Sequence, residues 1–420
     1  MSDAALFLSQ TMAAILLPYL LWRGLRLRSW MPLVVAQILC GILLGRSVLG
    51  RVVPEFWQGA FGASLPALSG LAWISVILFA FLTGLHLDIE EIRRSRGRLA
   101  LVGLSSIFVP DALGIFAGLW LFTAYPAVVG PTAGPWQFAA GVGIALSVTA
   151  LPVLGAILRE TGLLGTRLGR EALVCASASD GLLWIVLTVL LTSLGNGSGS
   201  LSGLFRVTIF ATLYLVAMLF VVRPLLVRWL RVTIDTEALI IPIAGIIFGS
   251  AWISEMIGLH YILGAFIAGV IMPATVRQLL SERLELGTIT ILLPFFFMLT
   301  GLRTEIPLGS SVMVGTFIIA TVAAVAGKFL GTALPAYWSG RSPGEAMALG
   351  TLLQAKGLME IVILNILLES GVLTATGFTA LIGMALVTTA LVKPGLHLLG
   401  VVGKNRLDHA TPEPHLSRLD

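Results

Sequence analysis

Four ionisable residues lie near the middle of long apolar stretches in this 420-residue sequence: Asp111, Asp180, Lys328 and Lys356. At the centre of a lipid bilayer, a charged side chain costs roughly 2.5–3.5 kcal/mol on insertion scales. Residues of this kind inside a membrane typically mark ion pathways and proton relays. Their presence here indicates a protein that handles ions or protons within a membrane.

Asp180 is the best candidate for a carboxylate that holds a cation and a proton in turn. It lies in Cys175-Ala-Ser-Ala-Ser-Asp-Gly181, where small side chains leave room for water and for a neighbouring backbone. Surroundings of low dielectric disfavour the charged form of a carboxylate, so this group can exchange a proton for a cation in the working pH range. The alternative is a structural carboxylate that a lysine neutralises.

A second set of groups suited to a desolvated cation lies in Ala145-Leu-Ser-Val-Thr-Ala-Leu-Pro-Val153. Pro152 removes a helical hydrogen bond near mid-membrane and frees carbonyl groups upstream of it. These carbonyls and the hydroxyls of Ser147 and Thr149 are suitable oxygen ligands for a monovalent cation. Because proline kinks are common in membrane helices, a kink without a ligand role is the alternative.

The two lysines are expected to supply fixed positive charge. Lys356 could face the helix-end dipoles where a second broken helix crosses the first, and Glu360 is placed to pair with it at i,i+4. Lys328 is expected to neutralise a carboxylate, with a structural role and a coupling role both open. Asp111 could be a second titrating group or a partner of either lysine, and Glu360 is a further group that could titrate.

The composition requires a membrane around these residues. Hydrophobic residues make up 57% of the chain and charged residues 11%, against about 25% charged in soluble proteins. The mean hydropathy is +0.99, and apolar runs of about 18 residues or more recur along the chain. Nothing resembles a metal cluster, a phosphate-binding loop or a nucleophile triad. We therefore expect no enzyme active site, no cofactor and no nucleic-acid partner.

Thirteen transmembrane helices are expected from these runs. They lie near residues 4–21, 31–49, 67–86, 99–124, 137–158, 171–194, 203–222, 238–256, 259–273, 286–302, 311–338, 345–368 and 375–400. If the N-terminus is outside, most of the 26 Lys and Arg residues fall on the cytoplasmic side, and Arg46, Arg51, Arg206 and Arg303 fall outside. This separation follows the positive-inside rule. It predicts a multi-pass protein of the inner (plasma) membrane with a cytoplasmic C-terminus.

Two pairs of segments indicate an inverted repeat. Leu82–Ile89 resembles Leu299–Ile306, and Gln37–Gly45 resembles Tyr261–Gly269. Each pair joins span n to span n+7, so the matched spans run in opposite directions, as in many secondary transporters. The expected units are a first repeat at 1–194, a linker helix at 195–237, a second repeat at 238–402 and a cytoplasmic tail at 403–420.

Several segments resemble the monovalent cation:proton antiporter-2 family, and within it the plant-type cation/H+ exchangers. The matching stretches are Ala145–Leu158, Ser177–Asp180, Gly258–Gly269, Pro294–Leu302 and Ala355–Asn365. The resemblance implies an all-α sodium/proton antiporter fold with an inverted 6+6 repeat and crossed discontinuous helices in the fifth and twelfth spans. It also implies a homodimer in which a core domain moves against a dimerisation domain.

The family motif in the sixth span is Asp-Asp or Asn-Asp, and the resemblance places its ion-binding second member at Asp180. Its first member is Ser179 here, a departure from the pattern. In Asp-Asp members the first acid usually pairs with a lysine in the eleventh span, which Lys328 matches. With serine at that position, Lys328 needs either another partner or a lowered pKa. A single carboxylate resembles the electroneutral members of the family.

The sequence thus predicts a secondary active transporter that exchanges Na+ or K+ for H+ by alternating access, with Asp180 as the shared site of the cation and the proton. The expected partners are these ions, the lipid bilayer and a second copy of the chain. Two alternatives stay open. One is a non-transporting membrane sensor or membrane-embedded enzyme of the same fold, and the other is a passive channel.

Overall fold

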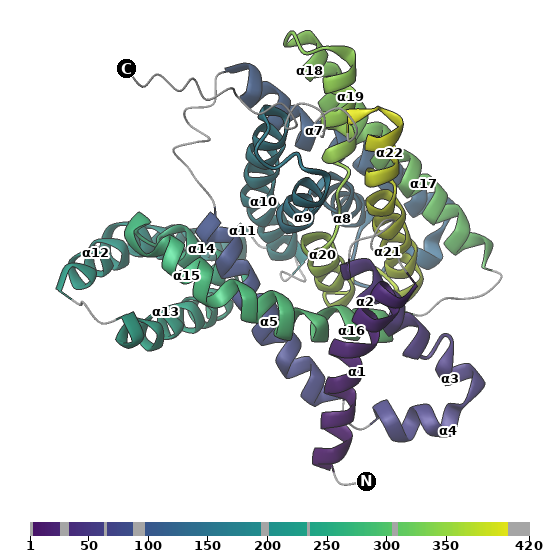
Figure 1. Ribbon diagram of the computed structural model, residues 1–420, viewed down its shortest axis with the longest axis horizontal. Helices are drawn as coiled ribbons and strands as arrows, with labels where there is room; N and C mark the ends of the chain where they lie inside the picture. The colour runs from purple at the N-terminus through teal and green to yellow at the C-terminus, as the bar shows by residue number, and fades with distance from the viewer. Residues whose placement is uncertain are drawn as a thin grey trace, which may run out of the picture.

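The helices of the computed structural model form two groups that lie beside one another (Figure 1). The structure describes residues 3–25, 33–62, 65–86, 97–194, 201–232, 236–304 and 310–401. The scaffold group comprises α1 (Asp3–Gly24), α2 (Leu33–Leu44), α3 (Leu49–Val52), α4 (Pro54–Trp57), α5 (Leu65–His86), α11 (Leu201–Ala217), α12 (Arg223–Val232), α13 (Thr236–Met256), α14 (Tyr261–Val270), α15 (Ala274–Gly287) and α16 (Leu293–Arg303). The crossing group comprises α7 (Gly97–Ala124), α8 (Pro135–Ser147), α9 (Leu151–Thr161), α10 (Arg167–Leu194), α17 (Ser311–Lys328), α18 (Leu334–Trp338), α19 (Pro343–Leu352), α20 (Leu358–Glu369), α21 (Ala375–Ala390) and α22 (Val392–Leu398).

The predicted all-α fold of about thirteen spans is confirmed. Among the described residues, nine helical runs are long and apolar enough to cross a membrane, and α14 is a shorter apolar helix. The remaining predicted spans are α10 and the two interrupted pairs, α8 with α9 and α19 with α20. Within the same ranges the one β contact is an isolated antiparallel bridge between Val129 and Leu373.

Short irregular helical turns join several of the long helices. The π-helical turns η4 (Met218–Val222), η5 (Thr288–Leu292) and η6 (Phe329–Ala333) each link two α-helices into one run, whereas η2 (Gln58–Gly62) follows α4 and η3 (Pro126–Val128) is a 3-10 turn. The helix of the seventh span begins at Leu201, close to the predicted 203, and through η4 it continues into α12 as far as Val232, beyond the predicted end at 222. Arg223 does not end the helix, since an arginine stem can extend towards the membrane interface.

The two repeated motifs pack in equivalent ways, which gives the inverted repeat a physical basis. Gly84 of α5 packs directly on α14, where a Cβ added to it would lie 2.0 Å from the Phe266 carbonyl oxygen. Gly301, the matching glycine of α16, packs on α2, where an added Cβ would lie 2.3 Å from the Ile38 carbonyl oxygen. Each motif therefore lets its helix approach a helix of the other repeat at backbone contact.

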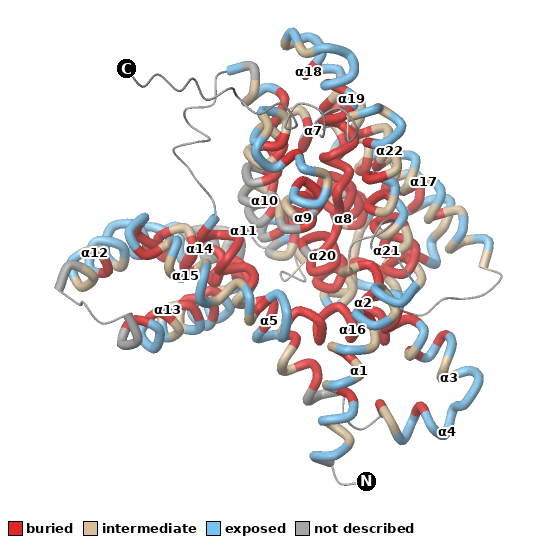
Figure 2. The backbone as a smooth tube through the Cα atoms, viewed as in Figure 1, coloured by how far each residue is buried: buried red, intermediate tan, exposed pale blue. Residues whose placement is uncertain are grey.

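Burial is concentrated in the crossing group and where α5, α14 and α16 meet (Figure 2). The α3, α4, α12 and α13 helices carry large exposed apolar side chains, among them Val52, Phe56, Leu225 and Trp252. An apolar surface of this kind suits contact with lipid. By contrast, the residues where α8, α9, α19 and α20 meet are almost completely buried.

Parts of the predicted features lie outside the described residues. These are the ends of the two repeated motifs at 87–89 and 305–306, the linker residues 195–200 and 233–235, and the tail at 403–420. The boundaries of the two repeats and of the linker stay predictions.

Substituting Gly301 tests the contact between α16 and α2. Gly301→Ala should destabilise the protein by about 1–3 kcal/mol, because the added methyl group forces the two backbones apart. Thermal unfolding of the purified protein in detergent, followed by the loss of its monodisperse size-exclusion peak, measures this. Gly249→Ala in α13 is the matched control, since nothing lies within 4 Å of a Cβ there. Equal melting temperatures for both variants would contradict the packing described.

Candidate functional site

Two interrupted helices cross in the centre of the crossing group. The α8 helix ends at Ser147 and α9 begins at Leu151, whereas α19 ends at Leu352 and α20 begins at Leu358. Pro152 lies in the first turn of α9, where its missing N–H is tolerated. The kink predicted at Pro152 is therefore a complete break, and the discontinuous helices predicted for the fifth and twelfth spans are present.

Backbone and side-chain hydrogen bonds join the two breaks. The Ala150 N–H donates to the Ala355 carbonyl oxygen at 2.9 Å, and Thr149 Oγ1 donates to the Leu353 carbonyl oxygen at 3.0 Å. Gly357 permits this close approach, since a Cβ there would lie 2.5 Å from a methyl carbon of Val153. The two non-helical segments thus satisfy part of each other's hydrogen-bonding capacity.

Lys356 lies at the C-terminal end of α8, with its ammonium group fully buried. Its Nζ donates to the carbonyl oxygens of Ala145 at 2.9 Å and Leu146 at 3.1 Å. The last carbonyls of a helix have no helical partner and carry the negative end of its dipole. The ammonium group therefore both bonds these carbonyls and offsets their partial charge.

Lys328, also fully buried, reaches the same helix end from α17. Its Nζ donates to the Ser147 carbonyl oxygen at 2.6 Å, to Thr149 Oγ1 at 2.7 Å and to the Ser106 carbonyl oxygen at 3.0 Å. Two ammonium groups thus lie at the oxygen atoms that the sequence suggested as cation ligands. The Ser147 hydroxyl is also engaged, since its Oγ donates to the Ile144 carbonyl oxygen at 2.9 Å. A ligand role for Ser147 and Thr149 stays a prediction.

Glu360 is the carboxylate nearest to Lys356 along the chain and is fully buried. Its Oε1 lies 3.4 Å from Lys356 Nζ, so the ion pair expected at i,i+4 is present. Neither carboxylate oxygen of Glu360 accepts a hydrogen bond within the described part of the chain. The carboxylate also lies in the first turn of α20, where the helix dipole favours a negative charge. Both of its oxygens retain capacity for a hydrogen bond or a proton.

The sixth span, α10, packs against α8 and α9 beside the crossing. Ser179 is buried on this helix, and its Oγ has no hydrogen-bond partner among the described residues. Asp180 belongs to the same helix, and its side chain lies outside what the structure describes. The arrangement brings the helix that carries the predicted shared site next to the two broken helices.

Asp111 is half-buried on α7 and lies against α8. A Cβ added to Gly143 would be 2.8 Å from its Oδ1, which places the carboxylate about one turn before the end of α8. Lys356 has Glu360 as its carboxylate partner rather than Asp111. A role for Asp111 as an additional titrating group stays a prediction.

Two residues at the crossing gave no signal in the sequence. Thr389 on α21 accepts a hydrogen bond from the Lys356 N–H at 3.0 Å and lies 2.7 Å from the Lys356 carbonyl oxygen. Gln354 Nε2 donates to the Val325 carbonyl oxygen at 3.0 Å. Both hold the non-helical segment before α20 in place. Cys40 and Cys175 are free and buried.

Comparison with known proteins gives a consistent result. Residues 11–397 match the family described as "Sodium/hydrogen exchanger, transmembrane". The chain is similar to Cation/H(+) antiporter 20 of Arabidopsis thaliana, with 34% identity over 380 residues that cover 86% of this chain and 45% of the plant protein. It is also similar to Na(+)/H(+) antiporter NhaS4 of Synechocystis, with 32% identity over 373 residues that cover 87% of this chain and 90% of the relative.

Among solved structures, the sodium proton antiporter MjNhaP1 of Methanocaldococcus jannaschii has the same fold. The TM-score is 0.58 at 13% sequence identity, and the match covers 94% of this chain and 98% of the other. At this identity the likeness concerns the fold alone. The chain spans less than half the length of the plant relatives that it matches.

Removing the charge of Lys356 tests its role at the crossing. Lys356→Met should destabilise the protein by about 3–5 kcal/mol, because it leaves Glu360 as an uncompensated buried charge. Lys356→Met/Glu360→Gln should recover part of that loss, since no buried charge is then left unpaired, although the Ala145 and Leu146 carbonyls still lack their donor. Thermal unfolding in detergent measures both variants. The control is Arg167→Met, which breaks an exposed i,i+4 pair with Glu171 and should cost at most about 1 kcal/mol. If the double variant were no more stable than Lys356→Met alone, the pairing would be contradicted.

Proposed function

Because the chain belongs to the sodium/hydrogen exchanger family, as its motifs predicted, we propose that it exchanges a monovalent cation, Na+ or K+, for protons as a secondary active transporter. The observation that carries this proposal is the crossing of α8–α9 and α19–α20 with two buried ammonium groups at its centre. Broken helices of this kind form the midplane binding sites of secondary transporters.

Asp180 is proposed as the site that the cation and the proton occupy in turn. Its helix, α10, packs beside the crossing, and the neighbouring Ser179 offers a buried hydroxyl oxygen without a hydrogen-bond partner among the described residues. A monovalent cation prefers oxygen ligands such as these. Competition for one carboxylate couples the two fluxes, because each ion displaces the other and only the loaded protein crosses between its two states.

The exchange is proposed to be electroneutral. Ser179 cannot ionise in the way that an aspartate at this position would. Asp180 then carries either one proton or one monovalent cation, and a full cycle moves no net charge across the membrane. Lys328 and Lys356 keep their charges as fixed groups, held by the end of α8.

The two helix groups support alternating access as the mechanism. The crossing group carries Asp180, both lysines and both broken helices, whereas the scaffold group contributes none of these. Movement of the crossing group against the scaffold group would expose the site to each side in turn. We propose a homodimer of the plasma membrane that associates through the scaffold group, with the N-terminus outside and the C-terminus in the cytoplasm.

A second candidate function rests on Ser179. The serine departs from the family motif, and a protein of this fold without that acid or amide could act as a membrane sensor or membrane-embedded enzyme rather than a transporter. Such a protein would fold and assemble in the same way. Absence of cation-dependent proton flux from a correctly folded protein would favour this candidate.

The assignment of Asp180 is tested in liposomes that hold a pH-sensitive dye. Adding Na+, K+ or Li+ outside at clamped membrane potential should cause proton efflux, and Asp180→Asn should abolish it, because an amide cannot alternate between a proton and a cation. Size-exclusion elution should be unchanged in the variant. Glu282→Gln, which alters an exposed carboxylate on α15, is the control and should retain the full rate. Near-normal exchange by Asp180→Asn would refute the assignment.

A further inference from the structure

An ion pair joins the two helix groups at one end of the molecule. Arg303 ends α16 in the scaffold group, and Glu369 ends α20 in the crossing group. Arg303 Nη1 lies 2.9 Å from Glu369 Oε1, and Nη2 donates to Ser69 Oγ at 3.3 Å. In the orientation predicted from the charges, this end faces outside. The pair therefore connects the two parts that alternating access must separate there.

A small cleft adjoins this pair, and Arg303 and Glu369 are among the residues that line it. Residues of α5, α14, α16 and α20 line it, including Trp73, Tyr261, Thr300 and Asn365. Asn365 Nδ2 donates to Thr300 Oγ1 at 3.2 Å and to the Ile361 carbonyl oxygen at 2.9 Å, which leaves its Oδ1 without a donor in the described part of the chain. The cleft thus has a charged mouth and amide and hydroxyl oxygens further in.

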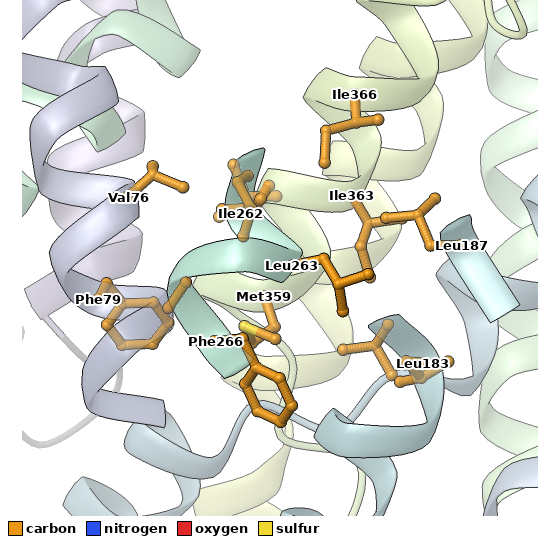
Figure 3. Packing of buried hydrophobic residues seen from close by; sticks show 14 of the residues in the cluster. Val76, Phe79, Leu183, Leu187, Ile262, Leu263, Phe266, Met359, Ile363 and Ile366 are labelled. Atoms are coloured by element: carbon orange, nitrogen blue, oxygen red, sulfur yellow. The ribbon is translucent and has the colours of Figure 1, made fainter. Parts of the chain in front are cut away.

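A layer of buried apolar side chains lies at the interface of the two groups close to this cleft (Figure 3). Its side chains come from α5, α14, α10 and α20. They are Val76, Phe79, Ile262, Leu263, Phe266, Leu183, Leu187, Met359, Ile363 and Ile366. Leu183 and Leu187 stand three and seven positions after Asp180 in the sequence. Val76, Ile262 and Ile366 of this layer also line the cleft, and packed apolar side chains of this kind exclude water.

The inverted repeat provides an internal comparison for the ion pair. His86 is the counterpart of Arg303 in the repeated motif, and it lies at the opposite end of the scaffold group. His86 is paired with Ser281 at 3.0 Å and Glu285 at 3.7 Å, both on α15 of the same group. Glu160, near the end of α9 on the opposite side from Glu369, is paired with Lys393 of α22, again within one group. Each of these two pairs therefore joins residues of one group.

From this ion pair across the two groups and the cleft that it lines, we propose that Arg303 and Glu369 form the outer gate of the transport pathway. The proposal rests on the proposed function, since it assigns these two residues to the closing of one side during exchange. When the crossing group moves, the ion pair breaks and the apolar layer separates. Glu369 then places an unpaired carboxylate at the mouth of the opened cleft, where it attracts cations. Asn365 and Thr300 offer oxygen atoms along the route inward.

Thiol accessibility tests the gate without requiring transport. The reporter is Ile366→Cys, which lines the cleft, in a chain that also carries Cys40→Ala and Cys175→Ala. A membrane-impermeant methanethiosulfonate reagent, added outside whole cells, should modify the reporter slowly when the gate is intact. Adding Glu369→Gln should raise the rate by about two- to fivefold, the factor that corresponds to one exposed ion pair. The charge swap Arg303→Glu/Glu369→Arg should return it towards the original rate.

The matched control is Glu255→Gln in the same reporter chain. Glu255 is an exposed carboxylate of α13 that accepts a hydrogen bond from the Tyr261 N–H at 2.9 Å, and this contact stays within the scaffold group. It should leave the modification rate unchanged. Equal rates with and without Glu369→Gln would overturn the gate. If the rates differ as expected but the liposomes show no exchange, the pair closes the cleft, whereas the proposed exchange and the gate's role in it fail.

Discussion

The rest of the structure depends on the contact between two buried lysine ammonium groups and the C-terminal end of α8. A helix that stops within the membrane leaves carbonyl oxygens that neither water nor the next turn can bond. Here Lys356 bonds the carbonyls of Ala145 and Leu146, and Lys328 bonds that of Ser147. A buried ammonium group is equally costly without partners. The broken helix and the two lysines therefore need one another, and neither would be stable in this place alone.

This contact also determines what a cation would meet at the crossing. The carbonyls of the broken helix are already bonded to ammonium groups, so a cation needs ligands from a neighbouring helix. The adjacent α10 carries the Ser179 hydroxyl and Asp180. In the proposed mechanism, the fixed positive charges nearby disfavour a cation and a proton together at one site. Such exclusion is what exchange by competition requires.

Much of this fold is predictable from the sequence, because membrane spans depend on local composition. The apolar runs specify the spans, Pro152 specifies the break before α9, and the glycines of the repeated motifs specify where helices meet at backbone contact. The i,i+4 spacing of Lys356 and Glu360 likewise predicts their pairing, since it depends only on helix geometry.

The contacts that could not be predicted join residues far apart in the chain. Arg303 and Glu369 are separated by 66 positions, and each alone is an ordinary charged residue at the end of a span. Thr389 gives no signal because a threonine in an apolar helix usually bonds its own backbone. Lys328 and Lys356 reach the α8 carbonyls because of how α17 and the segment before α20 pack around the crossing. This tertiary packing cannot be predicted from the local sequence around either lysine.

The central claim, that one carboxylate holds either a proton or a cation, is tested most directly by counting protons on cation binding. Purified protein in weakly buffered detergent solution would be titrated with Na+ or K+. Calorimetry would measure the amount of cation bound, and the change in pH would measure the protons released. The account predicts release of about one proton for each cation bound, since the cation must displace the proton from a shared site. Cation binding without proton release would contradict it.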